Sequence, residues 1–125
     1  MKIQESAENY LETIFVLGRD GKQVRSVDIS NELDFSKPSV SIAMKKLRLD
    51  GFIEIDASGF ISLTESGKSI AESMYERHTL LSNWLISLGV DEQTAVNDAC
   101  RMEHVISERS FLAIRKHIEE AEKCS

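Results

Sequence analysis

The sequence predicts a mainly helical protein that contains one small β-hairpin. Apolar residues recur at helical spacing through most of the 125-residue chain, which holds one proline and six glycines. Only residues 52–63 change to short β-rich runs. With 42% hydrophobic and 29% charged residues, the composition is that of a globular protein large enough to bury a core without disulfides.

Three helices are expected before the hairpin. The first spans about residues 4–18, where apolar positions follow a helical period. Ser26 is expected to cap a short second helix, because a Ser side chain can accept from the free amides of a first turn. Ser36 is expected to cap the third helix, which carries Pro38 in its first turn and ends at Gly51.

The hairpin is expected around Asp56-Ala57-Ser58, between runs at 52–55 and 59–63. Three more helices follow in the expectation, and they begin at Thr64, Asp91 and Ser107. Helix, helix, helix, hairpin is the order of a winged helix-turn-helix. We therefore expect a DNA-binding domain over residues 1–72 and an all-helical domain over residues 73–125.

Charge is unevenly distributed along the chain. The formal net charge is −6, yet residues 35–49 contain four cations and no acid. Local charge, and not the sum, decides whether an element can approach DNA phosphates. The basic stretch coincides with the third helix, which would be the recognition helix of a helix-turn-helix.

The third helix supplies most of the residues expected to contact DNA. Its first turns offer hydroxyls and an apolar proline surface to bases, and its later cations meet phosphates. The candidates are Arg25, Ser36, Lys37, Pro38, Ser39, Ser41, Lys45, Lys46 and Arg48. Ile42 either packs inward or makes only apolar contact. The plainer interpretation is a solvated basic helix in an ordinary helical domain. If the helix does read DNA, we expect modest base specificity from direct hydrogen bonds and most of the affinity from phosphate contacts, so that binding weakens steeply with salt.

A cluster of ligand-type residues occurs near the end of the fifth helix. Cys100, Glu103 and His104 have the spacing i, i+3, i+4, which puts a thiol, a carboxylate and an imidazole on one helix face. Each alone is more often a buried thiol or a solvated side chain. Packing three such polar side chains together is energetically costly unless they bind something, so the sequence predicts a metal site. His78 and Glu12 are candidate partners from distant segments.

The chain resembles the diphtheria toxin repressor family, which includes the iron-dependent repressors and the manganese transport regulator. The resemblance lies in the stretches 8–14, 36–41, 76–78 and 98–107, and Cys-x-x-Glu-His is its most specific part. It implies a homodimeric, metal-activated repressor with a winged helix and a helical dimerisation domain. Some members add an SH3-like domain, for which we expect this chain to be too short.

The resemblance also implies a ligand set. Cys100, Glu103, His104 and His78 match metal ligands of the family, and Glu12 matches a ligand of its manganese-type branch. Asn9 stands where that branch has Asp and the iron-type branch has Met. Cys100 matches the iron-type branch, whereas Val96 replaces a His that its ancillary site needs. The implied site is therefore a hybrid of the two branches, and a two-metal arrangement stays open.

Ligand chemistry narrows the metal only in part. Thiolate and imidazole favour the later divalent ions, whereas carboxylate and amide oxygens suit Mn²⁺. We expect Fe²⁺ or Mn²⁺ in the cell, with Zn²⁺, Co²⁺ or Ni²⁺ able to substitute in vitro. Metal binding should release the proton of Cys100 and weaken as pH falls.

The expected function is metal-dependent repression of metal-homeostasis genes by a cytoplasmic homodimer on double-stranded operator DNA, without a membrane or a small-molecule substrate. Large apolar residues of the last helices, among them Leu80, Leu81, Trp84, Leu85, Leu88, Phe111, Leu112 and Ile114, are expected to divide between the core and a two-fold interface. The alternative is a metal-independent winged-helix regulator. An enzyme with Cys100 as nucleophile is disfavoured, because the sequence has no glycine-rich oxyanion loop or phosphate cradle. His117 and Cys124 are expected to be solvated.

Overall fold

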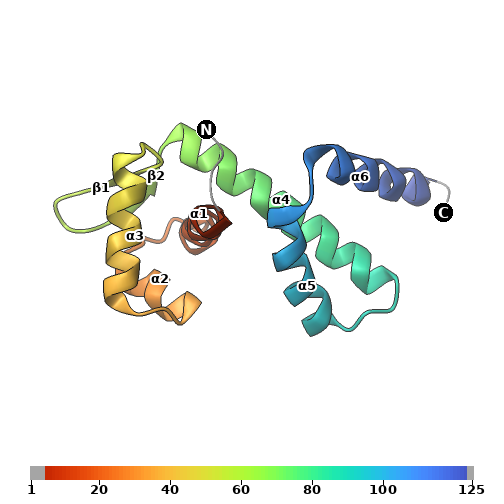
Figure 1. Ribbon diagram of the computed structural model, residues 1–125, viewed down its shortest axis with the longest axis horizontal. Coiled ribbons are helices and arrows are strands. Elements are labelled where there is room, and N and C mark those ends of the chain that lie inside the picture. Colours follow the sequence, from red (N-terminus) through yellow and green to blue (C-terminus); the bar gives the residue numbers. More distant parts are fainter. Residues whose placement is uncertain (1–4, 124–125) are drawn as a thin grey trace. The chain divides into compact units, whose positions relative to one another are not determined.

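The computed structural model describes residues 5–123 and contains six helices and one two-stranded sheet within them (Figure 1). It divides into two units, of which one ends at Ser73 and the other begins at Met74. Each unit is described by itself below. Among the described residues, no helix combines the length and apolar character that crossing a membrane requires.

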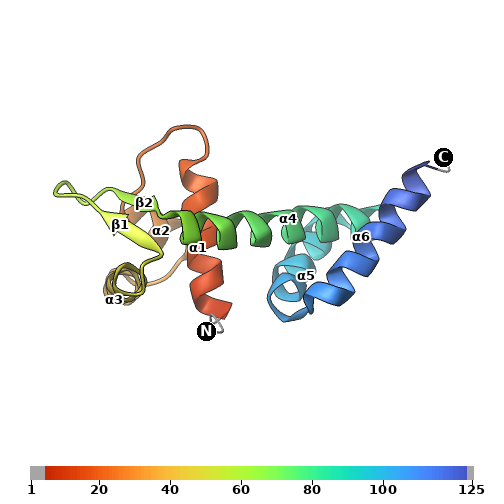
Figure 2. The same ribbon diagram turned by 90° about the horizontal axis from the view of Figure 1, so that it is seen from above.

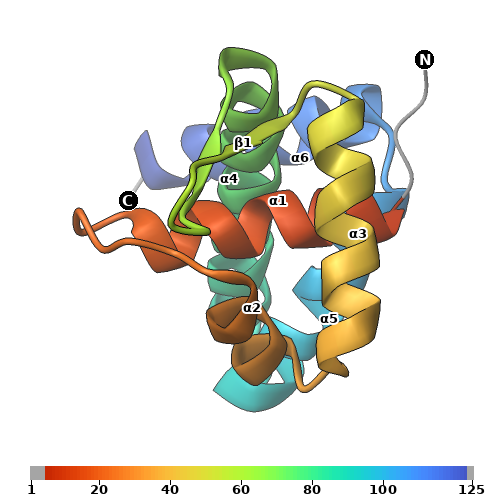
Figure 3. The same cartoon turned by 90° about the vertical axis from the view of Figure 1, so that its left-hand side faces the viewer.

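The first unit opens with three helices, α1 (Glu5–Gly18), α2 (Ser26–Leu33) and α3 (Lys37–Leu49). Helix α2 packs against both α1 and α3, and α3 is in full view in Figure 3. All three helices were expected, with bounds within a residue or two of those observed. The helical part of the predicted fold class is therefore confirmed for this unit.

Local capping explains where α2 and α3 begin. Ser26 was expected to cap α2, but the N-cap is Arg25, whose backbone N–H donates to Oδ2 of Asp28 at 2.9 Å. The carboxylate three residues into the helix, and not the Ser26 hydroxyl, fixes this end. Ser36 caps α3 as predicted, because its hydroxyl accepts from the backbone N–H of Ser39 at 3.3 Å.

The hairpin consists of β1 (Ile53–Ile55) and β2 (Ile61–Leu63), which pair antiparallel with Ile53 opposite Leu63. Its turn is held by Asp56, whose carboxylate accepts from the amides of Ser58 and Phe60, both at 2.9 Å. The hairpin projects outward from the helices of its unit (Figure 2). This arrangement is the predicted wing.

The core of the first unit joins all of its elements. Apolar side chains of the three helices meet the inward side of the hairpin and the start of the next helix. The buried members are Leu11, Ile14, Val24, Ile29, Val40, Met44, Leu47, Ile53, Ile61 and Ala71. Val40, Met44 and Leu47 define the inward face of α3, which leaves the opposite face of that helix for solvent.

Helix α4 (Glu65–Ser87) begins in direct contact with the chain that leaves α3. Thr64 donates from its backbone N–H to the carbonyl of Phe52 at 3.1 Å and from its hydroxyl to the carbonyl of Gly51 at 2.7 Å. The same hydroxyl accepts from the N–H of Gly67 at 3.3 Å, as expected of an N-cap. The hairpin is thus held at its base between α3 and α4.

The second unit consists of the later part of α4 with α5 (Glu92–Val105) and α6 (Glu108–Lys123). Asp91 caps α5 as predicted: the Thr94 amide donates to its Oδ2 at 3.0 Å, which holds the pKa of Asp91 below its usual value. Leu81, Ala99 and Phe111 form the buried centre of this unit. Each comes from a different helix, so one core joins α4, α5 and α6.

Candidate metal centre and nucleic-acid interface

The last two turns of α5 carry the predicted ligand cluster. Cys100, Glu103 and His104 each offer a ligand atom, and these atoms all lie within 4.8 Å of one another. Glu103 continues the buried stripe of Ala95 and Ala99, so a carboxylate occupies a core position of the helix. The i, i+3, i+4 spacing therefore produces the convergence that the sequence predicted.

Glu103 lies between two imidazoles. Its Oε2 lies 3.1 Å from Nδ1 of His78 on α4, and its Oε1 lies 3.3 Å from Nε2 of His104. The Glu103 side chain is 0% exposed and that of His104 is 3% exposed. A buried carboxylate needs compensation by positive charge, and a cation held by these side chains would supply it.

The distances fit a metal site. Metal–nitrogen and metal–oxygen bonds of about 2.1 Å place neighbouring ligand atoms about 3.0 Å apart in octahedral and about 3.4 Å apart in tetrahedral geometry. The observed separations of 3.1 Å and 3.3 Å fall in this interval. Cys100 is more exposed than Glu103, and its sulfur lies within 4.8 Å of the ligand atoms of Glu103 and His104. The donor set of sulfur, imidazole nitrogen and carboxylate oxygen is that of a transition-metal site.

Arg77 fixes the backbone of the cluster. Its Nη1 donates to the carbonyl of Glu103 at 3.1 Å and to that of Ile106 at 2.9 Å, and its guanidinium lies 5.3 Å from the centre of the Phe111 ring. Carbonyls in the last turn of a helix have no partner within the helix, and Arg77 provides one. One side chain of α4 thereby sets the position of α5 beside His78.

We predict that Arg77→Met weakens metal binding about 10- to 100-fold, the range found when groups that orient metal ligands are lost. Affinity for DNA at saturating metal should not change, because the ligands themselves remain. The Co²⁺ absorption spectrum, titrated on the apo protein, measures the effect. Arg115→Met is the matched control, since Arg115 also lies over Phe111, at 5.9 Å, but pairs with Glu76 instead of α5. Equal effects of both variants would contradict the assignment.

The remaining predicted ligands lie on α1, in the first unit. Asn9 and Glu12 are three residues apart and therefore share a helix face. Glu12 is buried, and the carbonyl of Asn9 accepts from the hydroxyl of Thr13 at 2.8 Å. Val96 and His117 are both exposed in the second unit, the latter as predicted. Cys124 lies outside the described residues.

The predicted DNA contacts gather on the outside of α3. Every candidate that α3 carries is exposed, as is its N-cap Ser36. The Ser36 hydroxyl donates to the Ser39 hydroxyl at 2.8 Å, so these two groups are engaged with each other. Arg25 lies apart from this set, with its guanidinium 4.4 Å from the centre of the Phe60 ring at the base of the wing turn.

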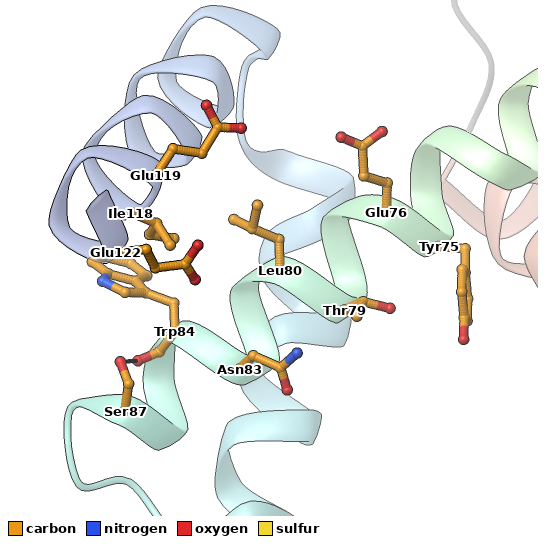
Figure 4. A pocket seen from close by; sticks show the side chains of 10 residues that line it. All are labelled: Tyr75, Glu76, Thr79, Leu80, Asn83, Trp84, Ser87, Ile118, Glu119 and Glu122. Atoms are coloured by element: carbon orange, nitrogen blue, oxygen red, sulfur yellow. Dashed lines mark hydrogen bonds between the residues drawn. The ribbon is translucent and has the colours of Figure 1, made fainter. Parts of the chain in front are cut away.

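An open groove of about 530 Å³ lies between α4 and α6 of the second unit. Figure 4 shows Leu80 and Trp84 of α4 and Ile118 of α6 lining it, with Glu119 and Glu122 on the α6 side. The apolar residues expected to form the core or an interface fall into buried and exposed groups. Leu81 and Phe111 are buried in the core, whereas Leu88 is 63% and Leu112 is 41% exposed.

The sequence of the chain is similar to known metal-dependent transcriptional regulators. Residues 2–59 match the family described as iron-dependent repressor, N-terminal DNA-binding domain, and residues 64–125 match its metal-binding and dimerisation domain. The transcriptional regulator MntR of Escherichia coli is 36% identical over 112 residues, which are 90% of this chain and 72% of that protein. The chain belongs to the iron-dependent repressor family. The resemblance stated from the sequence is therefore confirmed.

Other members of the iron-dependent repressor family agree. The iron-dependent repressor IdeR of Mycobacterium tuberculosis is 31% identical over 86% of this chain and 47% of that protein. The structure of the manganese regulator SloR has a TM-score of 0.81 and 26% identity, and a manganese-dependent transcriptional repressor in complex with manganese has a TM-score of 0.83 and 26% identity. These matches cover 95% and 90% of this chain, which spans about half the length of those structures (55% and 52%).

Membership of the family confirms the predicted winged helix-turn-helix followed by a helical metal-binding and dimerisation domain. The family consists of transcriptional regulators and not of enzymes, as expected. The sequence did not reveal the role of Arg77, because its partners are 26 and 29 residues away along the chain. Only its position next to His78 in the sequence could have indicated that Arg77 lies near the metal ligands.

Proposed function

We propose that this protein represses metal-homeostasis genes by binding operator DNA when Fe²⁺ or Mn²⁺ is bound. The observation that carries the proposal is Glu103, a fully buried carboxylate between two imidazoles at 3.1 Å and 3.3 Å. It lies within the residues that match a metal-binding domain. A cation held by these side chains would compensate the charge of a carboxylate buried at this place, which supports the proposal.

The proposed ligands are Cys100, Glu103, His104 and His78 of the second unit, joined by Glu12 and Asn9 of α1. Support for Glu12 and Asn9 comes from the sequence resemblance. The two oxygens of Glu103 lie against different imidazoles, which is the arrangement of a carboxylate that can serve two cations. A second cation bound by His78 and Glu12 is therefore part of the proposal.

We expect the metal to be selected by the coordination geometry of the site and by the metal's availability in the cell, and not by the intrinsic affinity of the ligands for it. Nitrogen and sulfur donors bind Zn²⁺ and Ni²⁺ more tightly than Fe²⁺ and Mn²⁺. A relative is called an iron-dependent repressor, and a similar structure is a complex with manganese. We propose Fe²⁺ or Mn²⁺ in the cell and substitution by Zn²⁺, Co²⁺ or Ni²⁺ in vitro. The site of action is the cytoplasm.

The functional form is a homodimer on double-stranded DNA. We assign DNA binding to residues 1–72, with α3 in the major groove, and metal binding and dimerisation to residues 73–125. The groove in Figure 4 and the exposed Leu88 and Leu112 offer apolar surface to a second copy. Two copies then present two recognition helices to half-sites about one duplex turn (~34 Å) apart, or a multiple of it.

Metal controls this spacing by linking α1 to α5. If metal binds the DNA-competent state about 100-fold more tightly than other states, the coupling free energy is about 2.7 kcal/mol. Thermodynamic linkage requires that operator DNA tighten metal binding by the same factor.

Titration of divalent ions against DNA binding tests the proposal. The parent, Cys100→Ala, Glu12→Ala and the control His117→Ala are compared on a duplex that the parent selects from a random pool. We expect metal activation in the parent and in the exposed His117 variant, and its loss in both ligand variants with helical content retained. Selective binding that strong chelators leave unchanged would instead establish the alternative, a metal-independent winged-helix regulator.

A further inference from the structure

The outward face of α3 carries an apolar side chain where a base-reading helix usually has polar ones. Ile42 is 71% exposed. It follows the buried Val40 by two positions, which is about 200° around a helix of 3.6 residues per turn. Of the two alternatives that the sequence left open for Ile42, packing inward is therefore wrong. The side chain points away from the core of its unit.

Ile42 is part of a strip along this face. Pro38 lies one turn before it and Leu49 two turns after it, and both are exposed, Leu49 by 74%. Lys45 and Lys46, one turn after Ile42, are also exposed. We call Pro38, Ile42 and Leu49 the outer strip. In the view of Figure 3, α3 lies at the front of its unit.

The surroundings of the outer strip favour DNA over a protein surface as its partner. The stretch from Phe35 to Leu49 has four cations and no acid, and its lysines stand beside the strip. Cations next to an apolar strip suit a groove whose walls are phosphates. Single exposed aliphatic residues are common on protein surfaces and by themselves indicate no binding site. On the outward face of a recognition helix, however, such a residue would face the edges of the bases.

We propose that Ile42 selects thymine by packing against its C5-methyl group in the major groove. Thymine alone presents a methyl group there, and an isoleucine side chain has no donor or acceptor with which to read another base. Hydroxyl readout by Ser36 is reduced, because its hydroxyl donates to that of Ser39 at 2.8 Å. The inference rests on the proposed function, in which α3 enters the major groove.

Replacement of thymidine by deoxyuridine removes only this methyl group and so tests the inference directly. A duplex selected by the parent from a random pool in Mn²⁺ is resynthesised with deoxyuridine at each thymidine in turn. Loss of one buried methyl should weaken binding about fourfold, and loss in both half-sites about fifteenfold. Ile42→Ala should bind the thymidine duplex correspondingly less tightly and be insensitive to deoxyuridine at the same position.

Leu49→Ala is the matched control, because Leu49 is equally exposed but lies at the end of α3 remote from the bases. It should keep the full deoxyuridine penalty. An Ile42→Ala protein that also keeps it, or a parent without any penalty, would overturn the inference and leave the proposed function standing. Failure of the parent to enrich any sequence with metal would overturn the proposed function, and this inference with it.

Discussion

Replacement of Glu103 by Gln is expected to abolish metal-activated DNA binding at metal concentrations that saturate the parent. The concentration of Mn²⁺ or Fe²⁺ for half-maximal binding should rise on the order of 100-fold or more, since loss of groups that merely orient ligands already costs about 10- to 100-fold. Fluorescence anisotropy of a labelled duplex during metal titration measures the shift.

The geometry explains why this nearly isosteric change should have so large an effect. Glutamine has nearly the volume of glutamate, so packing around the buried side chain is retained. It loses the negative charge and offers one oxygen where Glu103 offers two, which lie 3.1 Å and 3.3 Å from different imidazoles.

Asp98→Asn is the control for Glu103→Gln, because it removes an exposed carboxylate from the same helix and leaves the cluster intact. It should titrate like the parent. A Glu103→Gln protein with parental metal response and helical content would show that the buried carboxylate is structural and would exclude it as a ligand.

The metal cluster could be predicted from the sequence because the helix period alone brings Cys100, Glu103 and His104 together. Helix N-caps also depend on residues close together in the sequence, which is why the caps at Ser36 and Asp91 were predicted correctly. The prediction that Ser26 caps α2 was wrong because two capping signals compete at this end of the helix. The carboxylate of Asp28 accepts from the backbone N–H of Arg25, so the N-cap lies one residue before Ser26.

Tertiary features had no such local signal. Arg77 acts on carbonyls of another helix, and the sequence could not pair it with them. Periodicity likewise did not divide the apolar residues of α4 and α6 between core and surface. Leu81 is fully buried whereas Leu88 is 63% exposed, and only the packing of three helices determines which is which.

Gly67→Ala is expected to destabilise the DNA-binding unit by about 3 kcal/mol. Gly67 lies in the first turn of α4, where an added Cβ would collide with the carbonyl oxygen of Phe52. The backbone of Phe52 cannot move freely, because its carbonyl accepts from the backbone N–H of Thr64 at 3.1 Å. The neighbouring Gly51 carbonyl accepts from the Thr64 hydroxyl at 2.7 Å. Relief of the clash must break this junction between α3, the wing and α4.

Gly18→Ala provides the opposite expectation from the same chemical change. Gly18 ends α1, and a Cβ there would lie 3.5 Å from the Val24 side chain, an ordinary contact. Alanine is a better helix former than glycine, so this variant should be as stable as the parent or up to about 1 kcal/mol more stable. Urea unfolding of both variants in the apo form measures the difference. Equal stability of the two would mean that α4 does not approach the base of the wing this closely, and the wing would then lack the support that holds it beside α3.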